Sequence, residues 1–596
     1  MVGRHHERLP DILLAHGMVR ENDLAQTVAL LSRTEFIDPV ASPPDVRLID
    51  RIGAAECLRL GVLPWRDAGA LTVVLAARLE RFEAARTMLE TSFGPVRLAI
   101  ATETQMQAAL LQARRSLLAR RAETLTPAEH SCRGLVARQI GRWLLAFVAF
   151  SAAWALLAPR AAFAAFALWA VLTMVAVTAL RSAAGIATLL ARRRAEPPAD
   201  VTAIEGLPVI SVMVPLLKEK RIAEKLVQRL ARLDYPRELL DILLVVEEDD
   251  TITQAAIDAT RLPAWMRQIV VPRGAVQTKP RALNFALGFC RGSVIGVYDA
   301  EDAPSPDQLR LVAARFAAAP AEVACLQGVL DFYNARDNWL SRCFAVEYAT
   351  WFRVVLPGLS RMGLAVPLGG TTLFFRRAAL EALGGWDAHN VTEDADLGFR
   401  LARAGFRTEL IDTVTEEEAA CQPVRWVRQR SRWLKGYAMT WAVHMRDPAR
   451  LWRELGAWQV LGFQLLFLGT LSQFVLAPVL WSFWLLLLGL PHPLAGLAPP
   501  PVMIGLSGVF LLTELLTIAV SAYAVATPTH RWLVPWAPTL HVYFPLGALA
   551  AYKGLGEMVT RPFYWDKTPH GLTTAQTSFG RAERKASLLR AAMRRS

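Results

Sequence analysis

The chain is 596 residues long, which is too long for one hydrophobic core and predicts several folded units. Hydrophobic residues make up 53% of it and gather in long blocks, so the composition argues against a purely soluble protein and predicts a membrane protein. The formal net charge of +13 does not require a nucleic acid partner, because Lys and Arg cluster beside the apolar blocks, as at 192–194, where a membrane flank explains them.

Residues 1–115 predict a small α/β module that stays in the cytoplasm, because the N-terminus lacks the apolar core of a signal peptide. Residues 8–31 have apolar side chains at helical spacing with an interruption at Gly17, and a helix over 48–65 precedes a strand over 70–77. A basic linker over 116–142 follows. The six cysteines lie far apart without a CxxC pair, which predicts reduced thiols rather than disulfides or a zinc site.

Two nearly uncharged runs, 144–158 and 161–180, are separated by Pro159 and Arg160. Each approaches the roughly 20 residues that a spanning helix needs. Residues 143–190 are therefore expected to form a transmembrane hairpin with both ends inside.

Apolar runs return in the last third of the chain and predict three or four transmembrane helices within 456–552. If 458–490 forms two helices that break near Pro478, the basic tail 553–596 lies inside the cell, whereas one long helix would place it outside. The positive-inside rule favours two helices. The apolar runs are 458–474, 477–490, 502–526 and 533–552.

Between these blocks, residues 205–455 have a globular composition. Short β-branched runs alternate with helical patterns, which predicts an α/β domain with a largely parallel sheet. Because ligands collect beyond the carboxyl ends of such strands, the acidic residues at the ends of the second and fourth runs are candidate site residues, from Glu247 to Asp250 and from Asp299 to Asp302. The runs are 209–216, 240–248, 267–272 and 293–302.

The turn Asp299-Ala300-Glu301 lies at the C-terminal end of the fourth run. A divalent cation on a diphosphate takes oxygen ligands from one or two carboxylates, phosphates and water, so this turn can hold Mg²⁺ or Mn²⁺. Lys279 and Arg281 lie between the two acidic segments and could meet the phosphates. A solvated turn and a solvated basic face are the alternative interpretations. Together, the residues predict a site for a nucleotide diphosphate.

The stretch 392–398, TEDADLG, concentrates three carboxylates and permits three interpretations: a metal site, a catalytic base, or a helix start. At a helix start, Thr392 would be the N-cap and the carboxylates, Asp396 included, would favour the positive end of the helix dipole. Both roles can coexist, because a helix start is a rigid platform for a base. The context favours the base for Asp394 and the cap for Asp396.

An ordered set of motifs resembles glycosyltransferase family 2 in its cellulose-synthase-like, membrane-embedded branch. The resemblance implies a cytosolic GT-A domain with a mixed, largely parallel sheet, inserted between transmembrane helices. It also implies a UDP-sugar donor and an inverting reaction. The motifs are VMVPLLKE, LLVVEEDD, TKPRALNFAL, YDAEDAPSP, PLGGTTLFFRR, LGGWD, TEDADLGFRL and QRSRW.

The resemblance assigns roles to individual residues. Asp394, with Glu393 beside it in the TED motif, is the general base, which a sugar hydroxyl needs at neutral pH. Guanidinium groups of the QxxRW motif hold the pyrophosphate, and its indole gives a sugar ring a stacking surface. The same segment also fits a basic amphipathic helix on anionic lipid. The remaining residues are Glu248 and Asp249 for the uracil end, Asp299 and Glu301 for the metal, and Gln429, Arg430, Arg432 and Trp433.

The N-terminal module resembles the MshEN domain, some members of which bind cyclic di-GMP. The segment RLPDILLAHG, residues 8–17, and residues 48–64 match the two helical motifs of that domain. By this resemblance Arg8 pairs with a phosphate, and Leu9 and Leu13 pack on guanine. The alternative is a docking module in which these leucines are ordinary core.

The domain order resembles bacterial exopolysaccharide synthases of the XagB type. The leading hypothesis is a processive synthase in the inner membrane that extends a β-linked polysaccharide from UDP-glucose and exports it, with export proteins as possible partners. One alternative is a single transfer to a lipid-linked acceptor. Another is a non-catalytic cyclic di-GMP receptor or scaffold.

Overall fold

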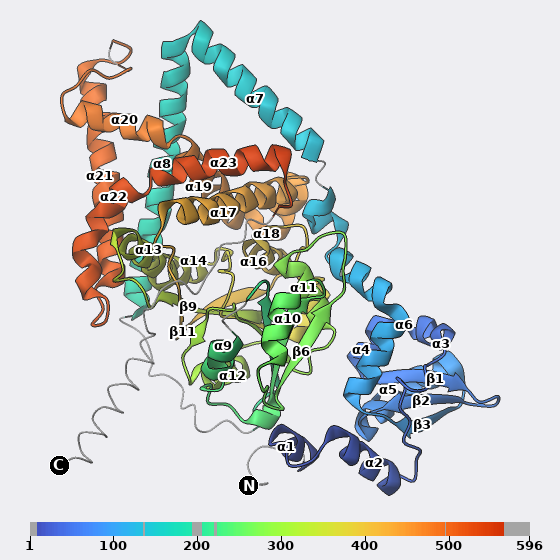
Figure 1. Ribbon diagram of the computed structural model, residues 1–596. Helices are drawn as coiled ribbons and strands as arrows, with labels where there is room; N and C mark the ends of the chain where they lie inside the picture. The colour runs from blue at the N-terminus through green and yellow to red at the C-terminus, as the bar shows by residue number, and fades with distance from the viewer. Residues whose placement is uncertain (1–8, 135–136, 193–205, 220–222, 495, 565–596) are drawn as a thin grey trace, which may run out of the picture.

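The computed structural model describes residues 9–134, 137–192, 206–219, 223–494 and 496–564. Figure 1 shows a small N-terminal α/β module in blue, a central α/β domain in green to yellow, and long helices in cyan and in orange to red. Arg8, the basic residues 193–194 and the tail 565–596 lie outside the described residues.

The N-terminal module is built around a three-stranded sheet in the order β1-β2-β3, with β1 antiparallel and β3 parallel to β2. Gly17, with a φ of 65°, interrupts the first helices as the sequence predicted. Gly53, with a φ of 97°, divides the helix expected over 48–65. The elements are α1 (Leu9–Ala15), α2 (Glu21–Leu31), α3 (Val46–Ile52), α4 (Ala54–Leu60), β1 (Val62–Asp67), β2 (Thr72–Ala76), α5 (Leu79–Phe93) and β3 (Val96–Ile100).

Helix α6 (Glu103–Thr124) runs through the expected domain boundary at residue 115 and reaches the central domain. Its buried side chains Met106, Leu110 and Leu118 belong to the same hydrophobic core as Phe285 of the central domain. The first part of the expected basic linker is therefore a packed helix. Two short 3₁₀ turns, Ala128–His130 and Cys132–Gly134, follow it.

The central domain contains an eight-stranded mixed sheet in the order β6-β5-β4-β7-β10-β9-β11-β8. Strands β4, β5, β6 and β7 are mutually parallel, and β10 runs antiparallel between β7 and β9. This confirms the expected fold class. The strands are β4 (Ile210–Leu216), β5 (Leu240–Glu247), β6 (Met266–Val271), β7 (Val294–Val297), β8 (Ala303–Pro304), β9 (Val323–Phe332), β10 (Leu373–Arg376) and β11 (Arg407–Glu417).

Helices cover both faces of this sheet, and β4, β5 and β7 bury nearly every side chain, as a parallel sheet between two helical layers requires. The helices of the domain are α9 (Ala223–Leu230), α10 (Thr251–Asp258), α11 (Lys279–Leu287), α12 (Gln308–Ala318), α13 (Trp339–Thr350), α14 (Leu356–Arg361), α15 (Arg377–Ala382), α16 (Glu393–Arg403) and α17 (Pro423–His444).

Three helical segments of the described chain are long and apolar enough to cross a membrane: 159–191, 448–475 and 500–525. They indicate association with a membrane. In Figure 1, α8 and α21 lie side by side, and α17 and α23 lie against each other and run in a different direction. The elements are α7 (Ala137–Leu157), α8 (Pro159–Arg192), α18 (Pro448–Gln464), α19 (Thr470–Val475), α20 (Ala477–Leu487), α21 (Pro500–Val525), α22 (Leu540–Tyr543) and α23 (Leu546–Thr560).

The expected spanning helix over 533–552 is not formed. A 3₁₀ segment, Arg531–Thr539, precedes α22, and α23 then packs along α17. Pro535 and Pro538 explain the break, because proline lacks the N–H that a continuous α-helix needs. Helix α20 is also only 11 residues long, too short to cross alone.

Candidate active site

A cavity of about 310 Å³ lies beyond the carboxyl ends of β5 and β7 and is bordered by α16 and α17. It brings together most of the site residues that the sequence predicted, from segments far apart in the chain. The predicted residues that line it are Lys279, Asp299, Glu301, Glu393, Asp394, Gln429, Arg430, Arg432 and Trp433. Glu248, Asp249 and Arg281 do not line it.

Asp394 is the second residue of α16 and lines the cavity together with Glu393. Its Oδ1 atom accepts a hydrogen bond of 2.8 Å from the backbone N–H of Ala395. On the other side, a Cβ built at Gly370 would lie 3.1 Å from Oδ2 of Asp394. Glycine at position 370 therefore leaves the carboxylate open to the cavity.

Glu393 and Asp394 form a buried pair of carboxyl groups. Burial, and then the charge of Asp394, raise the pKa of Glu393 to about 7. Burial also raises the pKa of Asp394, while Lys279 and Arg432 oppose the rise. A carboxylate with a raised pKa is a stronger base at neutral pH, so the pair can accept a proton from a hydroxyl group in the cavity.

The helix-start interpretation is confirmed in position, because Thr392 is the N-cap residue of α16 and Asp396 lies in its first turn, but the Thr392 side chain makes no cap hydrogen bond. Its hydroxyl donates to Oδ1 of Asn390 at 3.4 Å instead. Asp396 is buried, with Arg400 Nε at 2.8 Å and His444 Nε2 at 3.2 Å. Although burial opposes ionisation, Arg400 and His444 hold the pKa of Asp396 below its usual range. Asp396 thus joins α16 to α17.

The acidic turn after β7 combines one ion pair with carboxylate oxygens that lack partners. Lys279 Nζ lies 2.5 Å from Asp299 Oδ1. In the described part of the chain, Oδ1 of Asp302 and Oε1 of Glu417 are buried without a hydrogen-bond donor. Burial, and then neighbouring carboxylates that include Asp299 and Glu301, raise the pKa values of both groups.

This excess of negative charge fits a hard divalent cation, which prefers carboxylate oxygens. Asp299 and Glu301 would hold Mg²⁺ or Mn²⁺ there. Within the described residues, no three His, Cys, Asp or Glu side chains are arranged to hold an ion by themselves. Phosphate oxygens and water would therefore have to complete the coordination.

The nucleotide end of the cavity differs from the prediction. Glu247, the last residue of β5, lines the cavity, whereas Glu248 pairs with Arg115 of α6 and Asp249 accepts a bond of 2.8 Å from Gln277 Nε2. Glu248 and Asp249 lie in the turn after β5, where they contact α6 and the loop 272–278 instead of the cavity. The sequence includes Glu247 among the acidic candidates at this strand end, but the family resemblance places the uracil contact at Glu248 or Asp249.

Arg281 was predicted to meet phosphate, but its side chain is completely buried. Its Nη1 atom donates to Oε2 of Glu247 at 3.1 Å, and Nη2 donates to the carbonyl of Pro272. A buried guanidinium needs a carboxylate partner, and Glu247 supplies one on the cavity side. Arg281 therefore acts behind the cavity wall rather than in the cavity.

The QxxRW segment lies on α17. Gln429, Arg432 and Trp433 line the cavity as expected. Arg430 also borders it, but its guanidinium donates to Oε2 of Glu347 at 2.6 Å and lies 4.5 Å from the ring centroid of Trp433. Arg430 is therefore an ion-pair partner that supports the indole, rather than a free group for a diphosphate.

The sequence did not predict how far the cavity continues between the long helices. Arg181 of α8 and Thr517 of α21 line both this cavity and a second one of about 120 Å³. Glu514 and His541, whose side chains are 2.7 Å apart, line only the second cavity. Isolated polar residues in apolar helices are a usable signal, since they seldom face lipid.

The N-terminal residues proposed for cyclic di-GMP lie at a domain contact. Leu9 is exposed and Leu13 half-buried on α1, while Arg8 is outside the described residues. Helix α1 packs against residues 237–239 of the central domain, and its Asp11 pairs with Arg78 at 2.7 Å. The ligand assignment stays a prediction.

The mixed sheet, with acidic residues after its parallel strands and a carboxylate pair on α16, is GT-A-like. Residues 208–436 match the family model described as glycosyltransferase like family 2, and residues 32–119 match the MshEN domain. The chain therefore carries both domains. The segment 8–17 precedes the matched part of the MshEN domain.

Curated relatives differ in their acceptors. The chain is 31% identical over 237 residues to the beta-monoglucosyldiacylglycerol synthase of Synechocystis sp., which covers 38% of this chain and 48% of that protein. It is 22% identical over 266 residues to the probable glucomannan 4-beta-mannosyltransferase 1 of Arabidopsis thaliana, covering 42% and 47%. The chain spans about half the length of these relatives.

Among solved structures, the mannosyltransferase PcManGT from Pyrobaculum calidifontis, in complex with GDP-Man and Mn²⁺, matches with a TM-score of 0.41 and 20% identity. The match covers 64% of this chain and 99% of that one.

Proposed function

We propose that this protein is an inverting glycosyltransferase that transfers a hexose from a nucleotide-diphosphate sugar, with UDP-glucose as the first donor to test. The observation that carries the proposal is the single cavity in which the Glu393–Asp394 pair faces the Lys279–Asp299 pair. A proton acceptor and the cationic side chain of Lys279, which can bind phosphate, thus border the same cavity. Direct displacement with one base inverts the anomeric centre.

In this proposal Asp394 takes the proton of the acceptor hydroxyl, and Glu393 stays beside it as the coupled carboxyl group. Lys279 binds the diphosphate, and Trp433 gives the acceptor sugar a stacking face. Asp299 and Glu301 would hold Mg²⁺ or Mn²⁺, which would supply positive charge to the departing diphosphate.

For the acceptor, the leading candidate is a growing β-linked polysaccharide that passes between α8 and α21 and is exported across the inner membrane, with the catalytic domain in the cytosol. The continuation of the cavity past Arg181 and Thr517 supports it. The second candidate is a lipid acceptor, which the apolar walls of the same passage and the lipid-glucosylating relatives favour. Activation by cyclic di-GMP belongs to this proposal as an optional regulatory step.

The test uses the full chain in membrane vesicles with several radiolabelled UDP- and GDP-sugars, with and without cyclic di-GMP. Asp394→Asn should reduce turnover by about 10³-fold, within the range that general-base catalysis contributes. Asp412→Asn, which changes an exposed carboxylate of β11, is the matched control. Full turnover in Asp394→Asn would reject the base assignment.

Product analysis separates the acceptors. A water-insoluble or long soluble glycan supports the polysaccharide, and a lipid-extractable monoglycoside supports the lipid. Cyclic di-GMP binding without turnover of any sugar would leave only the receptor interpretation.

A further inference from the structure

Helix α6 is the physical connection between the N-terminal module and the donor end of the cavity. Figure 1 shows it extending from the N-terminal sheet to α11. Its first turn is held by Glu103, 3.3 Å from Arg291, and Gln107 accepts a bond of 3.0 Å from Arg267. Buried side chains then continue along the helix into the core of the central domain.

Glu123, in the last turn of α6, lies directly behind the wall of the cavity. Its Oε1 atom accepts a hydrogen bond of 2.6 Å from the backbone N–H of Ala275 and is 3.3 Å from Nε of Arg281. Arg281 is bonded on its other side to Glu247, which lines the cavity. A buried arginine is thus shared by a carboxylate of the interdomain helix and a carboxylate of the site.

Gly274 gives independent support for this contact. A Cβ built at Gly274 would overlap the carboxylate of Glu123 and the guanidinium of Arg281. Its backbone φ is not in the left-handed region, so the close approach, rather than the backbone conformation, accounts for the glycine. The loop 272–278 can therefore lie against Glu123, and it leads directly to Gln277, Thr278 and Lys279 on the cavity wall.

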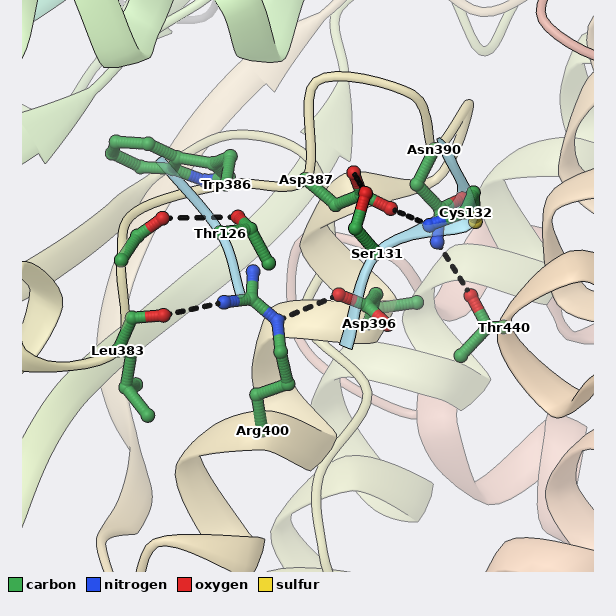
Figure 2. A network of polar contacts seen from close by, with 12 residues as sticks. Thr126, Ser131, Cys132, Leu383, Trp386, Asp387, Asn390, Asp396, Arg400 and Thr440 are labelled. Atoms are coloured by element: carbon green, nitrogen blue, oxygen red, sulfur yellow. Dashed lines mark hydrogen bonds and ion pairs between the residues drawn. The ribbon is translucent and has the colours of Figure 1, made fainter. Parts of the chain in front are cut away.

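The chain beyond Glu123 is also fixed to the central domain, as Figure 2 shows. Thr126 Oγ1 donates to the carbonyl of Gly384 at 2.9 Å, and the Ser131 hydroxyl donates to Asp387 at 2.7 Å. The backbone N–H of Cys132 donates to the same carboxylate at 2.6 Å. Glu123 is held between two anchored segments, so its carboxylate has a defined position.

We infer that Glu123 is a positioning residue of the donor site, which places Glu247 through Arg281 and places the loop that carries Lys279 through Ala275. The inference rests on the proposed function, because it assigns the Glu247 end of the cavity to the nucleotide. It makes the interdomain helix part of the donor site. Loss of the Glu123 carboxylate would change affinity for the nucleotide and leave the base at Asp394 in place.

The experiment compares Glu123→Gln with Glu103→Gln. Glu103 is on the same helix and also pairs with an arginine of the central domain, but it does not lie behind the cavity wall. Donor KM and kcat are measured on the full chain in nanodiscs, and the Kd of UDP by calorimetry. Glu123→Gln should raise donor KM and the Kd of UDP on the order of tenfold, a common size for coupling between neighbouring groups, with kcat within about twofold. Glu103→Gln should match the wild type.

Gly274→Ala perturbs the same contact from the loop side and should reproduce the change in donor KM. If Glu123→Gln does not fold, this variant tests the inference in its place. Equal effects of Glu123→Gln and Glu103→Gln, or a fall in kcat with unchanged KM, would overturn the inference. If the wild type turns over no sugar, the proposed function fails while UDP affinity still tests Glu123. If the wild type binds neither UDP nor GDP, the inference falls as well.

Discussion

The two ends of the cavity are built on different principles. At the donor end, charged groups follow strand ends and are held in pairs, such as Lys279 with Asp299 and Arg281 with Glu247. At the membrane end, single polar residues on α8 and α21 are spread among apolar ones. The donor end therefore fixes charge in place, whereas the membrane end offers a few hydroxyl and charged groups along a passage.

The comparison predicts that a change at the donor end has the larger effect. Asp299→Asn removes a proposed metal ligand and the partner of Lys279, so turnover at fixed Mg²⁺ or Mn²⁺ should fall about 100-fold, as losses around metal sites commonly do. A chelator should abolish turnover of the wild type, and added metal should restore it. The metal concentration at half-maximal rate measures the effect.

Asp258→Asn, on the exposed end of α10, is the control for that substitution. An unchanged metal requirement in Asp299→Asn would contradict the assignment of the turn.

The carboxyl pair gives the next largest effect, on the pH profile. Because the pKa of Glu393 is raised to about 7, the pair keeps a proton below that pH and releases it above. Ionisation of Glu393 places a second negative charge beside Asp394 and makes it a stronger base, so the rate should rise through about pH 7 and level off above it. In Glu393→Gln this rise should disappear, because glutamine does not ionise.

Initial rates between pH 5 and 9 test this, with donor KM measured at each pH. A rise at the same pH in Glu393→Gln would show that another group titrates.

The smallest effect is expected at the membrane end. Thr517→Val removes a hydroxyl from the passage and should weaken acceptor use by about fivefold, the worth of roughly one hydrogen bond. Donor KM should not change. Ser507→Ala on the same helix is the control, because Ser507 does not line either cavity among the described residues. If Thr517→Val changed donor KM instead of acceptor use, the two ends of the cavity would not have separate roles.

The sequence predicted the donor end better than the membrane end for a physical reason. Parallel strands end at one edge of a sheet, so acidic residues after β5 and β7 had to converge. Residue type alone could not separate Lys279, which lines the cavity, from Arg281, which is buried behind it, because burial depends on Glu247 and Glu123. Arg430 lines the cavity as predicted, but its ion pair with Glu347 could not be predicted, since Glu347 comes from a distant helix.

The membrane part shows a different limit. Hydropathy predicted apolar runs correctly, but the run over 533–552 contains Pro535 and Pro538, which break it. Apolar length alone does not reflect the missing proline N–H groups. The position of Glu123 could not be predicted either, because its partners Ala275 and Arg281 belong to another domain.

The core shared by α6 and α11 also limits how the protein can be divided. A cut at residue 115, which the sequence suggested as a boundary, would separate Met106 and Leu110 from Phe285 and leave an apolar groove on the catalytic domain. Exchanging the N-terminal module with that of another protein would therefore require transplanting α6 whole, together with the surface of α11 that receives it. During evolution, the residues of α6 and α11 that contact each other are expected to change together.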